Sequence, residues 1–211
     1  MIPPNGPLPP PPTVRQRLLA AAEAVCSTDG LYDARIEDMT RRAGIAKGTF
    51  YLYFPSKEAI VQELTREALA ELGERCRMAV RGARSLTGRA RAIVATHLDF
   101  YGGNPGRLRI LHQARGLLTF SRPEWQPLAA AFDAHLDLLA ALLVTAADAQ
   151  EVARESARLL FGAVSGAASQ FALAGSGLPA AAAGGLDLPL AQMIRDYFHS
   201  RSPRPRPGST P

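Results

Sequence analysis

The chain has 211 residues, of which 47% are hydrophobic, and it carries a formal net charge of +5 with a pI near 9.7. This length accommodates one large domain or two small ones, and the apolar content is sufficient for a well-filled core. No run of eighteen apolar residues is available to span a membrane, and the N-terminus lacks the charged and apolar regions of a signal peptide. We therefore predict a cytoplasmic protein.

The two ends of the chain are rich in proline. Residues 1–12 contain seven prolines, and residues 200–211 read SRSPRPRPGSTP. Segments of this composition bury too little apolar surface to fold, so both are predicted to be disordered tails. Two interpretations of the basic C-terminal tail stay open: a contact with DNA, or an inert solvated segment.

Two short helical patterns separated by a glycine lie within residues 36–57, IEDMTRRAGIAKGTFYLYFPSK. The first packs through apolar residues spaced three and four apart, namely Ile36, Met39 and Ala43. It is expected to end at Gly44, because glycine adopts a positive φ without steric cost. A second helix can therefore begin almost at once.

The second pattern, residues 47–54, is predicted to be a two-turn helix with Phe50 and Phe54 on one face. Pro55 cannot continue it, and Ser56 is a suitable N-cap for the next helix. Two helices joined by a short glycine-containing turn form a helix-turn-helix, whose second helix enters the major groove of DNA. The alternative is an ordinary corner between two helices with a solvated basic face.

Lysine is rare in this chain, since only Lys47 and Lys57 accompany twenty-two arginines, and both flank the second helix. An ammonium is a compact charge that suits a phosphate. Residues 1–78 hold ten basic and ten acidic side chains, whereas residues 35–57 hold five basic and two acidic ones. DNA affinity would then depend on local placement of charge, and we expect a modest salt dependence per monomer.

The stretch from about Arg17 to Leu64 resembles the DNA-binding domain of TetR-family transcriptional regulators. The resemblance lies in the run LLAAAEAVCSTDGLYDARIEDMTRRAGIAKGTFYLYFPSKEAI. Three elements of this run occur in register: an amphipathic helix that ends in a glycine, then the segment IEDMTRRAGIA, and then KGTFYLYF followed by PSKEAI. It covers roughly a quarter of the chain.

The resemblance implies roles for the aligned residues. Base edges or the nearest phosphates would be faced by Thr49, Tyr51 and Leu52. The phosphate backbone would be held by Lys47, Tyr53 and Lys57. Gly48 would let the helix approach DNA closely, and Thr40 would either donate to a phosphate or simply pack.

Two helix caps that are common in this family are missing. Arg35 stands where a Ser or Thr is usual, and Ala46 occupies another frequent Ser position. Each lost hydroxyl cap costs about 1 kcal/mol of helix stability. Arg35 either offsets this loss by touching a phosphate or is simply solvated.

The remainder of the chain is predicted to be helical, without a β-rich run. Further helices are expected near residues 88–101, 106–116, 122–146, 150–174 and 187–199. With the first four, these make an all-α protein of about nine helices. We expect a helix-turn-helix DNA-binding domain over residues 13–62 and a helical regulatory and dimerisation domain over residues 63–199.

The helix at 150–174 carries an apolar stripe rich in small residues, and Gly162 and Gly166 permit close approach of another helix. Together with the helix at 187–199 it could form a four-helix bundle between two subunits, as the resemblance also implies. The predicted interface residues are Ala157, Phe161, Val164, Ala168, Phe171, Leu190 and Ile194. A homodimer would place two recognition helices about 34 Å apart on DNA. The alternative for the stripe is an intramolecular core.

The resemblance also implies a ligand pocket among the middle helices, whose occupant changes the separation of the two recognition helices. The candidate lining residues are Phe100, Tyr101, Leu111, His112, Leu117, Phe120, Trp125, Phe132, His135 and Phe161. Such a mainly aromatic and aliphatic set suits a small hydrophobic or aromatic effector. Arg109 or Arg115 would equally pair with a carboxylate.

The residues that could support catalysis or metal binding are few and scattered. Cys26 and Cys76 form neither a disulfide framework nor a zinc pattern, and they are interpreted as buried small hydrophobes or as a redox pair. The histidines lack ligand spacing, and no phosphate loop or nucleophile motif occurs. We therefore predict no metal, no cofactor and no enzymatic activity.

Together these patterns predict a homodimeric, ligand-responsive transcriptional regulator, most simply a repressor that binds a palindromic operator in double-stranded DNA. Within the same class, an activator or a ligand-independent repressor would have the same DNA-binding half. A different class is a helical interaction or lipid-binding protein whose helix-turn-helix has lost DNA binding. An enzyme is the third alternative.

Overall fold

The computed structural model describes residues 12–120, 122–143, 150–173 and 187–201. The described residues form nine α-helices and contain no strand, which confirms the all-α prediction for this part of the chain. The helices are α1 (Val14–Asp33), α2 (Ile36–Ala43), α3 (Lys47–Phe50), α4 (Lys57–Ala79), α5 (Leu86–Gly103), α6 (Pro105–Leu117), α7 (Gln126–Leu143), α8 (Gln150–Leu173) and α10 (Asp187–Arg201). Short 3₁₀ turns follow α4 and α6 and precede α7. The predicted tails lie almost wholly outside the described residues.

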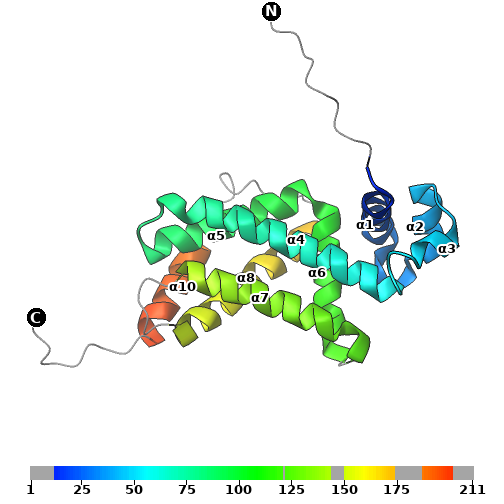
Figure 1. The fold of residues 1–211 in the computed structure, drawn as a ribbon. Helices are drawn as coiled ribbons and strands as arrows, with labels where there is room; N and C mark the ends of the chain where they lie inside the picture. Colours follow the sequence, from blue (N-terminus) through cyan, green and yellow to red (C-terminus); the bar gives the residue numbers. More distant parts are fainter. Residues whose placement is uncertain (1–11, 121, 144–149, 174–186, 202–211) are drawn as a thin grey trace, which may run out of the picture.

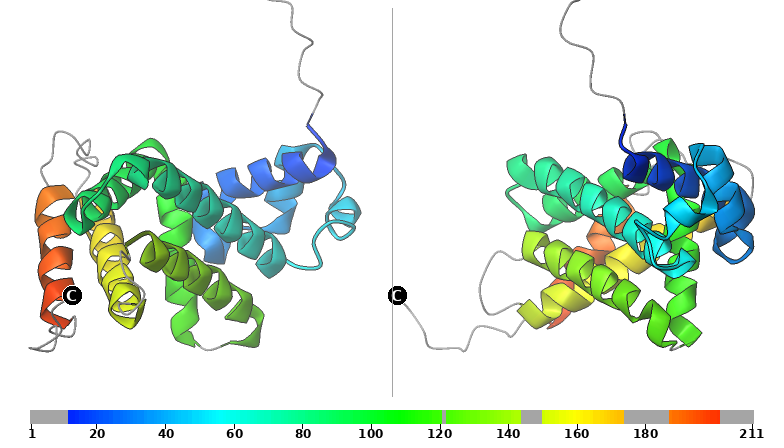
Figure 2. Two further views of the ribbon diagram at one scale, coloured as in Figure 1. Left: turned by 60° about the vertical axis from the view of Figure 1, so that its left-hand side comes forward. Right: turned by 45° about the vertical axis from the view of Figure 1, so that its right-hand side comes forward.

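The helices form a small N-terminal unit and a larger helical body (Figure 1). Helices α1, α2 and α3 lie at one end of the molecule, and α8 and α10 lie toward the other. The long helix α4 runs from the small unit into the body, and two further views show the same separation (Figure 2). Helix α6 packs against α1, so the two parts are joined by α4 and by the contact between α6 and α1.

Capping residues account for where several helices begin. Thr13 and Gln16 form a reciprocal capping box at the start of α1. The Ser56 hydroxyl accepts a hydrogen bond from the backbone N–H of Ala59 at the start of α4, as the sequence predicts. Helices α2 and α3 begin at Arg35 and Ala46 without a side-chain cap, which confirms the expected loss of both caps.

Gly44 ends α2 with a φ of 67°, in the left-handed region where glycine is favoured. Gly30 likewise has a φ of 87° and interrupts α1, which then continues to Asp33. This break agrees with the glycine expected near the end of the first helix.

The predicted two-turn helix over residues 47–54 is wrong in its length. Regular α-helix covers only Lys47–Phe50, and residues 51–53 form a turn. Gly48 and Thr49 have weak helix propensity, and the residue before Pro55 is biased away from helical dihedrals. The backbone N–H of Phe54 still bonds to the Phe50 carbonyl at 3.0 Å, so the segment stays compact.

The predicted dimer stripe on α8 is also wrong, because most of its residues belong to the core of a single chain. The buried members are Ala157, Phe161, Val164, Ala168 and Ile194, while Phe171 and Leu190 are half-buried. Helix α8 packs this face against α5, α6, α7 and α10. The intramolecular alternative therefore accounts for the buried residues of the stripe.

Candidate functional site

Helix α3 and the turn after it form an exposed segment held by two buried aromatic rings. Phe50 and Phe54 are both buried, and their ring centroids lie 5.9 Å apart. Between them, Leu52 is 81% exposed, Tyr51 50% and Tyr53 42%. Exposed large side chains that are neighbours on one segment form a candidate interaction surface. We call residues 47–53 the reading segment.

Lys47, at the start of the reading segment, is paired with Glu37 of α2 at 2.5 Å, and both side chains are about half exposed. The hydrogen bond from Lys47 lowers the pKa of the Glu37 carboxyl, and the same bond raises the pKa of the Lys47 ammonium. A DNA phosphate that binds Lys47 must therefore compete with Glu37. Sequence reasoning missed this partner because the two residues lie on different helices and share no helical spacing.

Two other predicted phosphate contacts are engaged within the protein. The Lys57 ammonium donates to the carbonyls of Leu31 at 3.0 Å and Tyr32 at 2.9 Å, so it satisfies the end of α1. Thr40 is buried, and its hydroxyl donates to the Glu37 carbonyl. The packing alternative is therefore the better account of Thr40, which the sequence had offered as a phosphate donor.

Gly48 is exposed, and a Cβ added there would meet no atom of the described residues within 4 Å. Gly48→Ala should therefore leave the fold intact and raise the free energy of unfolding by up to about 1 kcal/mol, because alanine is the better helix former. If Gly48 lies against DNA, the added methyl group should weaken operator binding about tenfold or more. The measurement is a chemical unfolding curve beside a DNA titration.

Gly82 provides the control for this substitution, because a Cβ there also meets open space and Gly82 lies in the 3₁₀ turn after α4. Gly82→Ala should leave DNA affinity unchanged. Equal DNA affinity in Gly48→Ala and the wild type would show that Gly48 does not approach DNA closely.

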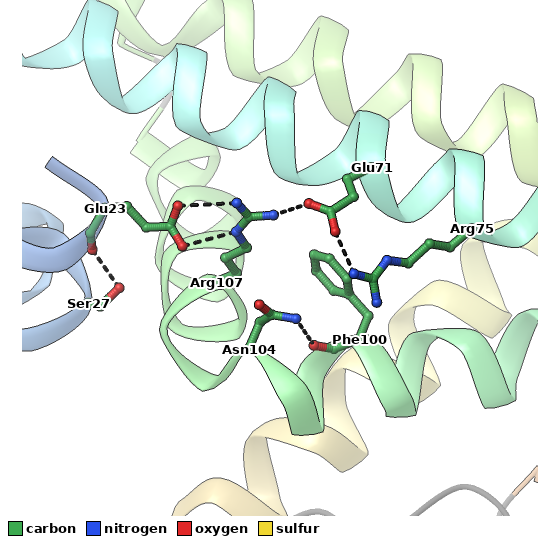
Figure 3. A network of polar contacts seen from close by, with 7 residues as sticks. All are labelled: Glu23, Ser27, Glu71, Arg75, Phe100, Asn104 and Arg107. Carbon is green, nitrogen blue, oxygen red and sulfur yellow. Dashed lines mark hydrogen bonds and ion pairs between the residues drawn. The ribbon is translucent and has the colours of Figure 1, made fainter. Parts of the chain in front are cut away.

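Arg107 of α6 joins the N-terminal unit to the helical body (Figure 3). Its guanidinium donates to both carboxylate oxygens of Glu23 on α1 and to Glu71 on α4. Glu71 also accepts from Arg75, whose guanidinium lies 5.2 Å from the centroid of the Phe100 ring. Burial opposes ionisation of Glu71, but its bonds to Arg75 and Arg107 outweigh that effect and hold its pKa below the usual range.

Further side chains of α6 contact the same stretch of α1. Gln113 accepts a hydrogen bond from the backbone N–H of Leu31 at 2.7 Å. Arg109 donates to the Ser27 carbonyl at 2.6 Å and also to the Thr28 carbonyl. Helix α6 is therefore tied to α1, and α1 in turn packs against α2.

The structure brings only some of the predicted ligand residues to open space. Phe132 and Phe161 line one groove, His135 lines a second, and Leu117 and Trp125 line a small third one. The residues that belong to the closed core instead are Phe100, Tyr101 and Leu111. His112 is exposed and bonded to Ser169, and the side chain of Phe120 lies outside the described residues.

Two grooves are large enough for a small molecule. The first, about 440 Å³, lies between α6, α7 and α8 and is lined by Arg115, Leu118, Ala129, Phe132, Asp133, Leu136, Arg158 and Phe161. The second, about 480 Å³, lies between α4 and α7 and is lined by Arg66, Leu69, Ala70, Arg77, Pro127, Ala130, Ala131, Ala134, His135 and Leu138. Arg158 was not predicted as a lining residue, although it precedes Phe161 by three residues on the same helix.

Two buried histidines lie behind Phe161. The rings of His97 and His135 are 5.7 Å apart, and Phe161 lies 5.8 Å and 5.3 Å from them. In the described residues, Nε2 of His97 and both ring nitrogens of His135 lack a hydrogen bond of normal geometry. Burial lowers the pKa of His97 to about 4 and, with the neighbouring His97, that of His135 to about 3.

These depressed pKa values predict acid sensitivity. The unfolded chain binds protons at both histidines below about pH 6.5 while the folded protein does not, so stability is full above that pH and falls toward pH 4. Between pH 7.5 and pH 5.0 the wild type should lose more stability than His135→Leu, and the difference between the two losses should be on the order of 2 kcal/mol. Urea unfolding of both proteins at these two pH values measures it, and equal losses would contradict the burial argument.

Cys26 and Cys76 are both free and buried. Burial raises the pKa of the Cys26 thiol to about 11 and that of Cys76 to about 12, which leaves little thiolate at neutral pH. Cys76 Sγ lies 3.8 Å from Nδ1 of His97, within the core. Their environment is that of small buried hydrophobes.

Within the described ranges, no group of His, Cys, Asp and Glu side chains is arranged to hold a metal ion. The same part of the chain contains no helix that is long and apolar enough to cross a membrane.

Helices α2 and α3 form a helix-turn-helix that presents the exposed reading segment, and α4 and α6 join it to a larger helical body. This arrangement is typical of helix-turn-helix regulators with a separate helical domain. Residues 18–64 match the family model described as bacterial regulatory proteins, tetR family. An uncharacterized HTH-type transcriptional regulator of Bacillus subtilis, YdgC, is 48% identical over 50 residues, which are 24% of this chain and 26% of that protein.

Solved structures extend the likeness to most of the chain. The fatty acid degradation regulator FadR of Bacillus halodurans superposes with a TM-score of 0.68 at 19% identity, covering 88% of this chain and 96% of that one. FadR of Bacillus subtilis in complex with stearoyl-CoA gives a TM-score of 0.63 at 18% identity, covering 87% and 95%. Residues 18–64 are thus similar to the DNA-binding domain of the TetR family of bacterial regulatory proteins, and the described residues as a whole have the fold of such regulators. The sequence match spans about a quarter of the length of YdgC.

Proposed function

We propose that this chain is a DNA-binding transcriptional regulator that acts as a homodimer, represses from a palindromic operator and responds to a small molecule. The observation that carries the proposal is the reading segment, where Tyr51, Leu52 and Tyr53 are exposed beside Lys47 while Phe50 and Phe54 anchor the backbone. Backbone contacts position such a segment and side chains at base edges specify the sequence. We assign Thr49, Tyr51 and Leu52 to reading, and Lys47 and Tyr53 to positioning.

Selection of bound fragments from a random DNA library tests this proposal. An enriched site with two-fold symmetry is expected, because a homodimer presents two reading segments about one DNA turn apart. Thr49→Ala or Leu52→Ala should change the preferred bases. Absence of enrichment with folded wild-type protein would favour the alternative of a helical interaction or lipid-binding protein that no longer binds DNA.

The second subunit is proposed to bind the outward face of α8 and α10. On this face Leu159 is 42% exposed and Met193 44%, and a Cβ on Gly162 or Gly166 would meet no described atom within 4 Å. An open, small-residue surface lets another helix approach closely. The four-helix arrangement predicted from the sequence is retained, but it uses the opposite side of α8.

This interface makes a direct prediction about mass. Light scattering should report about twice the 22.5 kDa chain mass for the wild type. Gly162→Arg should give a folded monomer, because the added side chain meets open space in one chain and would clash with a partner helix. Gly82→Arg is the matched control and should remain dimeric. A dimeric Gly162→Arg variant would place the interface elsewhere.

Response to a small molecule is proposed for the helical body. The grooves beside α7 supply apolar walls and arginine side chains, as expected of a ligand site with few polar groups. The structural relative from Bacillus subtilis was solved in complex with stearoyl-CoA, which supports a response to a small molecule in this chain. Helix α6 connects the first groove to α1 and could transmit occupancy to the reading segment.

A further inference from the structure

The groove between α6, α7 and α8 combines an apolar floor with cationic sides. Phe132 and Phe161 are buried, and their ring centroids lie 6.2 Å apart. The half-buried side chains of Leu118 and Leu136 extend the apolar wall. With a volume of about 440 Å³, the groove can take the apolar body of a small molecule.

Two arginines line this groove without a carboxylate partner among the described residues. The Arg115 guanidinium lies 5.2 Å from the centroid of the Phe161 ring, and Arg158 is exposed on α8. The acidic residue of the groove, Asp133, lies 3.4 Å from the guanidinium of Arg154, so its charge is already partly balanced. Guanidinium groups recognise carboxylate and phosphate with paired hydrogen bonds.

The second groove provides a comparison within the same molecule. Its arginines are paired, Arg66 with Glu63 at 2.6 Å and Arg77 with Glu74 at 2.9 Å. The two grooves have similar volumes but differ in available positive charge. Charge complementarity therefore singles out the groove of Arg115 and Arg158 for an anion.

We propose that the groove between α6, α7 and α8 binds an anionic amphiphile, whose carboxylate or phosphate head pairs with Arg115 and Arg158 and whose apolar tail lies on Phe132 and Phe161. This inference rests on the proposed function in taking that ligand as the effector of the regulator. Arg115 lies on α6, the same helix that contacts α1 through Arg107 and Gln113. A ligand that shifts α6 on binding would therefore also shift α1 in the N-terminal unit.

Calorimetric titration with dodecanoate, below its micelle threshold, tests the site. We expect one dodecanoate per chain, with binding at least about tenfold weaker for dodecan-1-ol and for dodecyltrimethylammonium, because the neutral and cationic heads cannot pair with arginine. Dodecyl phosphate is run in parallel. The tighter of the two anionic probes identifies the head group, and either order supports the site.

Substitutions locate the binding and keep the result interpretable. The double variant Arg115→Met/Arg158→Met should weaken binding of the anionic probe about tenfold or more, whereas Arg77→Met in the second groove should leave it unchanged. Equal thermal unfolding of the variants checks that each one folds. Binding that survives in the double variant, equal binding of dodecan-1-ol, or no binding of either anion overturns the inference.

The DNA experiment separates this inference from the proposed function. A chain that binds the selected operator but none of the anionic probes refutes only the ligand assignment. A chain that binds dodecanoate through Arg115 and Arg158 but enriches no DNA supports the ligand site and refutes the regulator. Release of operator by dodecanoate from the wild type, and not from the double variant, would support both.

Discussion

Lys47→Ala is expected to weaken binding to the selected operator about 10- to 100-fold and to reduce the salt slope by about one unit per subunit. The reason is that a phosphate contact releases condensed counterions whatever the base sequence. The loss should therefore be similar for operator and unrelated DNA. Titrations at several salt concentrations measure both the affinity and the slope.

Glu37→Gln is the matched control for Lys47. In the free protein Glu37 holds the Lys47 ammonium at 2.5 Å, so removing its charge should release Lys47 for a phosphate. We expect tighter binding and a steeper salt slope in Glu37→Gln, the opposite of Lys47→Ala. The combined variant should behave like Lys47→Ala alone, because Glu37 would act only through Lys47. Weaker binding in Glu37→Gln would mean that the pair serves to position α3 rather than to compete with DNA.

Arg107→Met is expected to lower the free energy of unfolding by about 1–2 kcal/mol, a value between those of exposed and buried ion pairs. This ion-pair cluster is partly exposed, since the side chain of Arg107 is 24% exposed and those of its partners Glu23 and Glu71 are 34% and 38% exposed. The substitution leaves Glu23 without its guanidinium and removes one of the two arginines that bind Glu71. Urea unfolding at neutral pH measures the loss.

Arg107→Met should also uncouple the helical body from the reading segment. Ligand binding in the body should persist, while its effect on DNA affinity should fall, because Arg107 ties α6 to both α1 and α4. The double variant Arg107→Met/Glu23→Gln should recover part of the lost stability without restoring the coupling. Full coupling in Arg107→Met would exclude this arginine as the connection and leave Gln113 and Arg109 as the contacts to examine.

Much of the local structure follows from local sequence. The φ of Gly44, the N-cap of Ser56 and the shared face of Phe50 and Phe54 depend on residues within a few positions of one another, so periodicity and capping predict them. The helices of the body likewise lie close to their predicted ranges. The length of α3 was overestimated because weak helix formers and the following proline shorten a segment that otherwise has helical spacing.

The sequence by itself determined that the described part of the chain is helical, approximately where its helices lie and that Phe50 and Phe54 anchor one short segment, since those features arise from neighbours along the chain. Only the tertiary structure decided which face of α8 is buried, that Glu37 holds Lys47, and that Arg107 reaches Glu23 across 84 positions. A stripe of small apolar residues is equally suited to a core and to an interface, and only the packing of α5, α6, α7 and α10 distinguishes them. Contacts between residues far apart in sequence depend on how the helices pack, and a single helical pattern carries no information about its partner.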